Sequence, residues 1–273
     1  MSRAMIHFWK MNGAGNDFVM LDNRDLRQAL STAQIAALCD RHRGVGADGL
    51  LAVEPAQNGA DFRMRYYNAD GGEAEMCGNG ARCFAKFAAV LSGGNVERVS
   101  FETPAGRIGA TFHGENVCIA MSDPHSLRLD LSLNVAGPQM AVYSVNTGVP
   151  HAVVVVDDLE VVPVREWGAA LRHHAEFQPK GTNANFLQVT AEGIAIRTYE
   201  RGVEDETLAC GTGMVACALV HHLLTAAPAP VKVKVKGGDT LEIGFEKSGD
   251  TFKNVTLTGP ADLVFEGEIK LPA

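Results

Sequence analysis

A short motif, Cys-Gly-x-Gly, occurs twice in this chain of 273 residues, and each copy follows a polar run and an Arg-x-Tyr segment. The first copy begins at Cys77 and the second at Cys210, about half of the chain apart. Tyr67 lies ten residues before the first cysteine, and Tyr199 lies eleven before the second. This duplication predicts two similar halves, each with one thiol at the start of a helix. Inversion of a carbon stereocentre needs such a pair, because one group removes a proton from one face and another delivers a proton to the other.

Each of these cysteines stands where a helix is expected to begin. Unpaired backbone N–H groups and the positive end of the helix dipole face outward at such a point. This setting stabilises a thiolate and lowers the pKa of a thiol from its usual value of about 8.5. The glycines remove side chains that would block the N–H groups, so the same turn can also cradle a carboxylate. Two such turns at matching places predict an acid/base site with two thiols.

The other four cysteines are expected to be small buried hydrophobes, as most free cysteines are: Cys39, Cys83, Cys118 and Cys217. No Cys-x-x-Cys occurs, and no Cys or His lies at the spacing of a zinc knuckle, so the sequence predicts no metal site. A redox pair, in which Cys77 and Cys210 oxidise to one another across a cleft, stays open as an alternative.

Composition excludes several classes of partner. The net charge of −8, without a cluster of Lys or Arg, argues against nucleic acid. The first residues lack the apolar core and cleavage site of a signal peptide, and the longest strictly aliphatic run, 153–156, is too short to span a bilayer. We therefore expect reduced thiols, a cytoplasmic protein and no membrane partner.

Hydrophobic periodicity predicts many short strands and few helices. The strongest helices are expected at 80–91 and 213–224, directly after the cysteine motifs, and others at 31–42 and 164–173. Ser31 or Thr32 is the expected N-cap of the helix at 31–42. Trp167 and Leu171 are expected to face inward from the helix at 164–173. Strands are expected at 8–10, 17–22, 50–53, 62–67, 98–103, 106–112, 115–121, 140–145, 152–156, 185–189, 195–199, 231–235, 241–245 and 254–258. Alternating Val and Lys at 231–235 is typical of an exposed or edge strand.

The two halves match in type, and a strongly curved antiparallel sheet is the natural way to bury an apolar helix such as 214–224. We predict an α+β fold with two pseudo-symmetric domains, each a curved, mostly antiparallel sheet wrapped around a central helix. A boundary is expected near Pro124, so the N-terminal half is residues 1–122, completed by 262–273. The C-terminal half is 123–261. The His173-His174 and His221-His222 pairs are placed on helix surfaces, where they are solvated or structural.

Polar residues near the motifs are candidates for substrate contacts. Asn16, Asn68 and Asn183 lie in polar loops flanked by strands; asparagine is common in turns, so each alone is uninformative. Together they supply the uncharged hydrogen bonds expected around a zwitterionic substrate. Glu200 and Arg201 would ordinarily be a surface ion pair of little worth. At the end of a strand that leads to a cysteine, they could instead bind a thiol or ammonium group and a carboxylate.

His151 follows Gly148 and Pro150 at a loop-to-strand junction, where site residues often lie, although a lone histidine beside a core strand is more often structural. Residues 44–49 fit the Gly-x-Gly-x-x-Gly dinucleotide fingerprint literally. That segment follows an expected helix rather than a strand, so we discount a dinucleotide site.

At these residues the chain resembles the diaminopimelate epimerase family. The resemblance is carried by MNGAGNDF at 11–18, NADGGEAEMCGNGARC at 68–83 and ERGVEDETLACGTG at 200–213. It implies two pseudo-symmetric domains with the substrate in the cleft between them, and usually a homodimer. It also implies a cofactor-independent interconversion of LL- and meso-2,6-diaminopimelate by a thiol/thiolate pair, in lysine and peptidoglycan precursor synthesis.

The resemblance also implies roles for individual residues. Cys77 and Cys210 are the acid/base thiols, and His151 and Glu200 orient or activate them. The implied contacts to the amino-acid substrate are Asn16, Asn68, Asn183, Glu200 and Arg201, with Gly78-Asn79 and Gly211-Thr212 as paired helix N-termini for the α-carboxylate. Two positions depart from the family pattern, with Val149 where Asn often precedes Pro-His and Gly49 where Gln often follows Asp. The resemblance therefore does not extend to those contacts with the distal end of the substrate.

Three other classes stay open. A proline or hydroxyproline racemase uses similar paired thiols but would not need so many polar contacts for a second amino-acid end. A phenazine-type isomerase of the same fold would lack the two cysteines. A non-enzymatic redox protein would hold a disulfide at rest. Deuterium incorporation from D2O at the α-carbon of diaminopimelate or of proline separates these classes.

Overall fold

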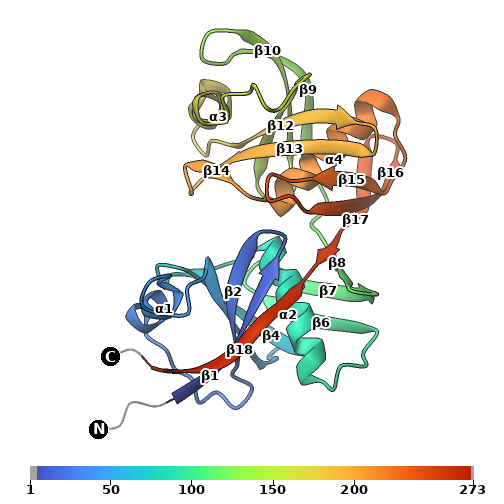
Figure 1. Cartoon of the computed structure of the whole chain (residues 1–273). Helices are drawn as coiled ribbons and strands as arrows, with labels where there is room; N and C mark the ends of the chain where they lie inside the picture. Colours follow the sequence, from blue (N-terminus) through green and yellow to red (C-terminus); the bar gives the residue numbers. More distant parts are fainter. Residues whose placement is uncertain (1–4, 272–273) are drawn as a thin grey trace. The chain divides into compact units, whose positions relative to one another are not determined.

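The computed structural model describes residues 5–271 of the chain, and the chain divides into two compact units. Unit 1 comprises Met1–Ile119 and Gly259–Ala273, and unit 2 comprises Ala120–Thr258. Both units consist of strands with a few helices, which Figure 1 draws as arrows and coiled ribbons.

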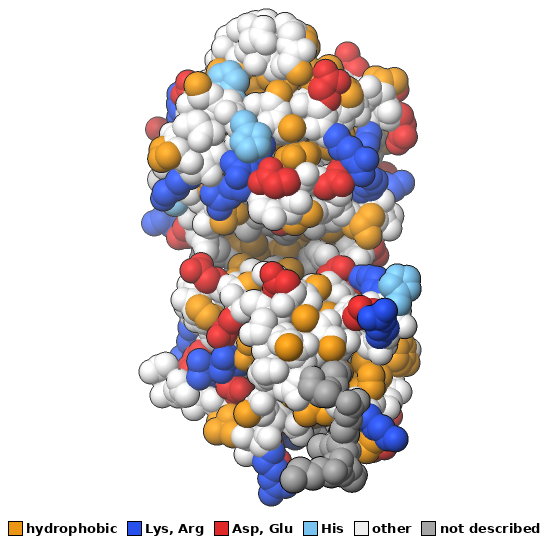
Figure 2. Space-filling view, turned by 90° about the vertical axis from the view of Figure 1, so that its left-hand side faces the viewer, with side chains coloured by type: hydrophobic (Ala, Val, Ile, Leu, Met, Phe, Trp, Pro, Cys, Tyr) orange, Lys and Arg blue, Asp and Glu red, His pale blue; other side chains and the backbone are white. Residues whose placement is uncertain are grey.

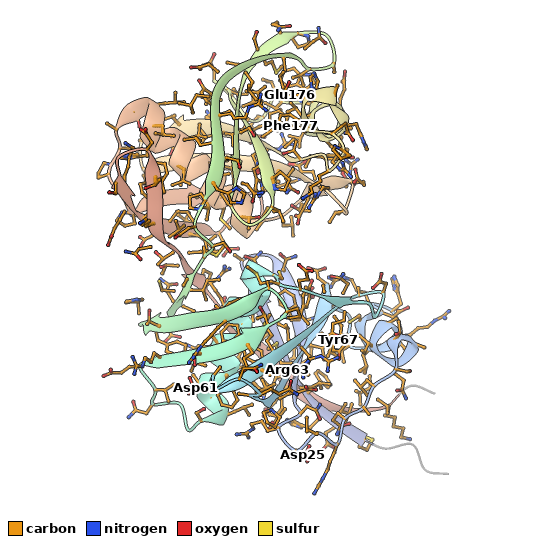
Figure 3. All side chains as sticks on the ribbon, turned by 180° about the vertical axis from the view of Figure 1, so that it is seen from behind. Asp25, Asp61, Arg63, Tyr67, Glu176 and Phe177 are labelled. Carbon is orange, nitrogen blue, oxygen red and sulfur yellow. The ribbon has the colours of Figure 1, made fainter. Side chains whose placement is uncertain are left out.

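Unit 1 holds a sheet and two helices. Its elements are β1 (Met5–Gly13), β2 (Asn16–Asp22), α1 (Thr32–Cys39), β3 (Gly49–Pro55), β4 (Phe62–Asn68), β5 (Glu73–Ala74), α2 (Gly78–Leu91), β6 (Arg98–Thr103), β7 (Gly106–His113), β8 (Asn116–Ala120) and β18 (Asp262–Lys270). Figure 3 labels Arg63 and Tyr67 on β4. The segment that ends the chain, β18, pairs antiparallel with β1, so both ends of the described chain lie in unit 1.

Unit 2 holds the remaining strands of the sheet and its own helices. Its elements are β9 (His125–Asn134), β10 (Gln139–Asn146), β11 (Pro150–Val155), α3 (Val164–His173), the 3-10 helix η1 (Ala175–Phe177), β12 (Asn183–Thr190), β13 (Gly193–Glu200), β14 (Asp205–Thr207), α4 (Gly211–Thr225), β15 (Val231–Lys234), β16 (Thr240–Ser248) and β17 (Thr251–Pro260). Figure 3 labels Glu176 and Phe177 of η1.

The pairing of strands is the same in the two units. In unit 1, β1–β2 is antiparallel, β2–β3 parallel, β3–β4 and β4–β5 antiparallel, β4–β6 parallel, and β6–β7 and β7–β8 antiparallel. In unit 2, the same sequence of pairings runs through β10–β11, β11–β12, β12–β13, β13–β14, β13–β15, β15–β16 and β16–β17. The predicted α+β fold with two pseudo-symmetric domains is confirmed.

The central helix of each unit packs against its sheet. In unit 1, α2 contacts β1, β2, β3, β4 and β6, and in unit 2, α4 contacts β10 to β13, β15 and β16. The residues of α4 from Gly213 to His221 are all buried, as expected for a helix that is apolar on nearly every side. Both helices begin directly after a cysteine of the repeated motif, which makes Cys77 and Cys210 their N-cap residues.

Smaller elements follow local sequence rules. The predicted N-cap of the first helix is confirmed at Ser31, whose hydroxyl accepts a hydrogen bond from the Gln34 backbone while the Gln34 side chain bonds back to the Ser31 backbone. This reciprocal pair satisfies two N–H groups that the first turn of a helix leaves without helical partners. In α3, Leu171 is buried and Trp167 packs against the same core, as its pattern predicts.

Two predictions about unit 2 are wrong. β15 is not an edge strand, because it pairs with β13 on one side and β16 on the other; its valines are buried and its lysines exposed. His221 does not lie on a helix surface, because the buried side of α4 includes it, at 6% exposed. The sequence pattern also missed β9, a ten-residue strand that pairs with β10.

The surface is mixed in charge. Figure 2 shows Lys and Arg side chains interspersed with Asp and Glu side chains on the face in view. Within residues 5–271, the helices are all too short or too polar to cross a membrane.

Candidate active site

Cys77 caps the N-terminus of α2 in unit 1. Its backbone is extended, and its sulfur accepts a hydrogen bond from the Gly80 N–H over 3.5 Å while its carbonyl receives the Ala81 N–H. The Cys77 side chain is half-buried. A sulfur held in this way lies against the N–H groups of a helix start, where negative charge is favoured.

Asn16 and Asn79 form one hydrogen-bonded group beside this turn. Asn79 Nδ2 donates to Asn16 Oδ1 over 2.7 Å, and Asn16 Nδ2 donates to Asp48 Oδ2 over 2.9 Å. Arg82, which is 0% exposed, donates to Asn79 Oδ1 over 3.0 Å and to the Gly13 carbonyl over 3.2 Å. Because the Arg82 guanidinium can only donate hydrogen bonds and the Asp48 carboxylate accepts one, the orientation of the Asn16 and Asn79 amide groups is determined.

Charged residues hold Asp48 in place. Arg41 donates to both Asp17 and Asp48 over 2.7 Å, and Lys10 forms an ion pair with Asp17 over 2.7 Å. Burial of Asp17 opposes its ionisation, but hydrogen bonds from Arg41 and Lys10 outweigh burial and hold its pKa below the usual range. Through Asp48, this network of ion pairs and hydrogen bonds therefore holds the Asn16 side chain in place.

Two further predicted positions of unit 1 have local structural partners. Asn68 is exposed, and its Oδ1 accepts a hydrogen bond from the Tyr66 hydroxyl over 2.9 Å. A Cβ at Gly49 would lie 2.5 Å from the Tyr67 carbonyl oxygen and 2.9 Å from the Tyr66 ring. A side chain does not fit at Gly49 without a shift of β4, so glycine is required there by packing.

Cys210 caps the N-terminus of α4 in unit 2 and is buried at 7% exposed. Its sulfur lies 3.6 Å from the Thr212 hydroxyl, which lies 2.9 Å from His151 Nε2. The His151 Nδ1 lies 3.1 Å from the side-chain nitrogen of Asn185. The structure thus brings together three predicted residues, and it adds Asn185, which the sequence did not single out.

His151 is 0% exposed. Burial lowers its pKa to about 3, with a smaller contribution in the same direction from the positive charge of Arg201. The imidazole is therefore neutral at physiological pH.

Asn183 and Arg201 form a second polar group in unit 2. Asn183 Oδ1 accepts a hydrogen bond from the Arg201 backbone N–H over 2.8 Å, and Asn183 Nδ2 donates to the Pro150 carbonyl over 3.1 Å. The Arg201 guanidinium donates to the Lys180 carbonyl over 3.2 Å. Burial raises the pKa of the neighbouring Glu200 carboxyl.

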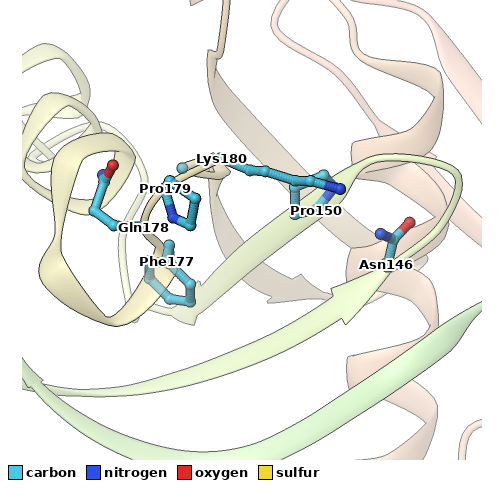
Figure 4. Close-up of a pocket in the computed structure, with 7 residues that line it drawn as sticks. Asn146, Pro150, Phe177, Gln178, Pro179 and Lys180 are labelled. Carbon is cyan, nitrogen blue, oxygen red and sulfur yellow. The ribbon is translucent and has the colours of Figure 1, made fainter.

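A pocket of about 260 Å³ adjoins this group (Figure 4). It is lined by Asn146, Pro150, Phe177, Gln178, Pro179, Lys180 and Gly181. Two of these, Pro150 and Lys180, give their carbonyl oxygens to Asn183 and Arg201. The pocket offers an apolar wall, two side-chain amides and one lysine beside the predicted substrate-binding residues.

Three of the other cysteines are core residues, as predicted, since Cys39, Cys83 and Cys217 are buried. Burial raises the pKa of Cys39 to about 11 and of Cys83 to about 12, and it raises that of Cys217 well above its usual value. Cys118 is only half-buried. Among the described residues, no three His, Cys, Asp or Glu side chains are grouped so that they could hold a metal ion.

The family model described as Diaminopimelate epimerase matches residues 8–127 and 143–264, with one cysteine motif in each segment. The chain belongs to the diaminopimelate epimerase family. A relative in Aquifex aeolicus named diaminopimelate epimerase is 45% identical, and the match covers 97% of this chain and 98% of that protein. Another relative of that name, in Chlorobaculum tepidum, is 44% identical, with 96% and 100% covered. As a member of this family, the chain is an isomerase that acts on amino acids.

Solved structures share the fold of this family member at low sequence identity. A phenazine biosynthesis protein of the PhzF family from Bacillus anthracis superposes with a TM-score of 0.75 at 15% identity, covering 97% of this chain and 99% of that chain. A hydroxyproline epimerase from Agrobacterium vitis superposes with a TM-score of 0.68 at 16% identity, covering 98% and 92%. These likenesses concern the fold alone.

Proposed function

We propose that this chain interconverts LL- and meso-2,6-diaminopimelate without a cofactor, with Cys77 and Cys210 as its two acid/base thiols. The observation that carries the proposal is the equivalence of the two cysteines. Each caps the central helix of a unit, and the strands of the two units pair in the same sense and order. This reaction supplies a precursor of lysine and peptidoglycan.

The reaction exchanges a proton on the α-carbon. One cysteine, as a thiolate, accepts the α-proton from one face of the carbon. The other, as a thiol, donates its proton to the opposite face, and the electron pair left by the first C–H bond forms the second. The pair therefore holds one proton between its two members, and the roles reverse in the other direction. This mechanism requires both cysteines to engage one substrate molecule.

An α-proton is far less acidic than a thiol, so the site must stabilise the carbanion-like transition state. The backbone N–H groups of Gly78-Asn79 and Gly211-Thr212 lie at the first turns of α2 and α4. Aimed at the α-carboxylate, they would stabilise the negative charge that develops there. His151 and Glu200 are assigned to the orientation or activation of the thiols.

The remaining polar residues are assigned to the substrate. Diaminopimelate carries an ammonium and a carboxylate at each end, so its distal end needs partners of its own. Asn183 and Arg201 are held next to each other beside the pocket at Lys180, and a guanidinium suits a carboxylate. Asn16, Asn68 and Glu200 complete the proposed contacts.

The test is isotope exchange. The reduced protein is incubated in D2O with LL-diaminopimelate, and deuterium at the α-carbon is followed by mass spectrometry. Deuterium in diaminopimelate together with appearance of the meso isomer supports the proposal. Deuterium in proline instead would indicate a racemase, and exchange into neither substrate would refute the proposal.

We further propose that the enzyme is a cytoplasmic homodimer. Reduced thiols are kept in that compartment. Three consecutive apolar residues of β18 are about half exposed, namely Leu263, Val264 and Phe265. Contiguous exposed apolar side chains on a strand favour an interface, and a second copy of this chain is the occupant proposed here.

A further inference from the structure

A series of hydrogen bonds leads through unit 2 to Cys210, and it is buried as far as His151 and partly buried at Thr212. Thr198 Oγ1 donates to Asn185 Oδ1 over 3.0 Å, and Asn185 Nδ2 lies 3.1 Å from His151 Nδ1. His151 Nε2 lies 2.9 Å from Thr212 Oγ1, which lies 3.6 Å from the Cys210 sulfur. Thr198, Asn185 and His151 are each at most 3% exposed, so water does not compete for the bonds among these three, whereas Thr212 is half-buried.

A backbone carbonyl determines which group donates and which accepts in this series of hydrogen bonds. Asn185 Nδ2 also lies 2.9 Å from the Ala152 oxygen, and a carbonyl only accepts hydrogen bonds. The side-chain nitrogen of Asn185 must therefore face Ala152 and His151, while its oxygen faces the Thr198 hydroxyl. His151 Nδ1 then accepts a hydrogen bond, so it carries no proton.

The proton of the neutral imidazole must consequently be on Nε2. The Nε2–H donates to Thr212 Oγ1, which leaves the hydroxyl hydrogen of Thr212 for the Cys210 sulfur. The Thr212 carbonyl is held by the Thr147 hydroxyl over 2.9 Å, which fixes this residue on a second side. The charge of Arg201 acts on His151, and the charge of Cys210 acts on Cys217.

Unit 1 provides an internal comparison for this series of hydrogen bonds in unit 2. The register of the strands places Phe18 opposite Gly49 and His151 opposite Asn183, at the same point of the parallel pairings β2–β3 and β11–β12. Two residues further along, Leu51 of β3 corresponds to Asn185 of β12.

The first turns of the two central helices bear out this correspondence. A Cβ at Gly80 in α2 would meet Phe18 and Leu51, and a Cβ at Gly213 in α4 would meet Asn185. The scaffold thus accepts apolar residues at the positions of His151 and Asn185, and Phe18 and Leu51 are at most 1% exposed. Buried polar groups are costlier than apolar ones unless fully bonded, so packing alone does not account for the polar set.

We propose that Asn185 is a positioning residue that fixes His151 as its Nε2–H tautomer, so that His151 and Thr212 form a donor relay which stabilises the Cys210 thiolate. His151 keeps its proton throughout and is not the base for this thiol. The proton that Cys210 gains or loses is exchanged with the substrate carbon alone. This inference rests on the proposed role of Cys210 as an acid/base thiol.

The tautomer is tested directly by NMR. The full-length protein is labelled with 15N-histidine, and the two ring nitrogens of His151, identified by their loss in His151→Gln, are observed through long-range 1H–15N correlations. We expect a protonated Nε2 and a bare Nδ1 at neutral pH. A proton on Nδ1, or a doubly protonated ring, would overturn the proposal. In Asn185→Asp the carboxylate can only accept, so the proton is expected to move to Nδ1.

The relay is tested by alkylation of Cys210 with iodoacetamide across pH, quantified by peptide mass spectrometry with Cys77 as the internal reference. Thr212→Val removes the hydroxyl donor. The pH midpoint of Cys210 alkylation should then rise by about one pH unit, so that alkylation below the midpoint becomes roughly tenfold slower. The pH midpoint of Cys77 alkylation should not change. Thr212→Ser keeps the hydroxyl and should keep the wild-type midpoint. Equal Cys210 midpoints in Thr212→Val and the wild type would refute the relay.

Neither measurement needs substrate. If the tautomer or the alkylation midpoint differs from the expectation while deuterium still enters diaminopimelate, the relay is refuted and the proposed function stands. If the tautomer and the alkylation shift are as expected but no deuterium enters diaminopimelate, the relay is supported and the proposed function is refuted.

Discussion

Asn79 donates a hydrogen bond to the side-chain oxygen of Asn16, and the side-chain nitrogen of Asn16 donates in turn to Asp48. One hydrogen and one lone pair of the Asn16 amide are thereby engaged, and the others remain for a substrate. The amide is also fixed in sense, since the buried Arg82 guanidinium can only donate to Asn79. The Asn16 amide is therefore held in one orientation, as its proposed role as a substrate contact requires.

Asn16→Asp should destabilise unit 1 in a pH-dependent way. It places a carboxylate where the amide nitrogen now lies 2.9 Å from Asp48, and two like charges at that distance disfavour joint ionisation. We expect a loss of about 1–3 kcal/mol at pH 7 that shrinks towards pH 5, as one carboxyl becomes protonated. Urea unfolding at both pH values measures this, with Asn16→Leu as the control. A deficit equal at the two pH values would contradict the charge argument.

Gly49→Ala should destabilise the protein because the new methyl group would meet the Tyr67 carbonyl oxygen at 2.5 Å. Overpacking of this kind costs about 1–3 kcal/mol. Gly109→Ala is the matched control, since nothing lies within 4 Å of a Cβ at that strand position. Thermal unfolding of both variants should show a lower Tm for Gly49→Ala alone. Equal Tm values would show that β4 shifts without cost.

The sequence predicted the cysteine turns well because their geometry is local. A Cys-Gly-x-Gly before an apolar run determines the helix start within a few residues, and α2 and α4 begin where the motif says. The same local reasoning found Ser31 as an N-cap.

Asn185 was missed because its partners are distant in sequence. It meets His151 through the parallel pairing of β11 and β12 and meets Thr198 through the antiparallel pairing of β12 and β13. Register between strands is set by tertiary packing, so the pattern within one strand does not reveal it. The same limit explains why β15 was wrongly predicted to be an edge strand. Its alternation of Val and Lys indicates that one face is buried, but it does not reveal the neighbouring strands β13 and β16.

Acid should destabilise the protein through His151. Its folded pKa, about 3, is below the unfolded value near 6.5, so the unfolded state binds more protons between these values. Stability should therefore fall as the pH falls below about 6.5, by up to roughly 1.4 kcal/mol per pH unit for this residue. The lowered pKa of His221 acts in the same direction, and the raised pKa of Glu200 acts against it.

The contribution of His151 is isolated by difference. The free energy of unfolding is measured by urea titration between pH 4 and 7 for the wild type and for His151→Gln, which does not titrate. The difference between the two curves should change by several kcal/mol across this range. A pH-independent difference would mean that the folded ring accepts a proton near its usual pKa.

Val264→Lys should dissociate the proposed dimer. Val264 is 56% exposed on β18, and a charge there would lose its hydration in an interface. The control is Val189→Lys, since Val189 is 49% exposed on β12 of unit 2. Size-exclusion chromatography with light scattering should give twice the chain mass of 29.1 kDa for the wild type and the control, and the single-chain mass for Val264→Lys. A single-chain mass for the wild type would exclude the dimer.

Cys77→Ala and Cys210→Ala should each reduce epimerisation of diaminopimelate by about 10²- to 10⁴-fold, the usual contribution of a positioned acid/base group. Cys83→Ala and Cys217→Ala are matched controls, one in each central helix, because they remove buried thiols whose raised pKa keeps them protonated. The controls should lose about 1 kcal/mol of stability and keep their turnover. Circular dichroism establishes that all four variants fold, and the interconversion of LL and meso isomers is followed by chiral chromatography. Near wild-type turnover in either Cys77→Ala or Cys210→Ala would rule out the two-thiol mechanism, since one thiol cannot serve both faces of the α-carbon.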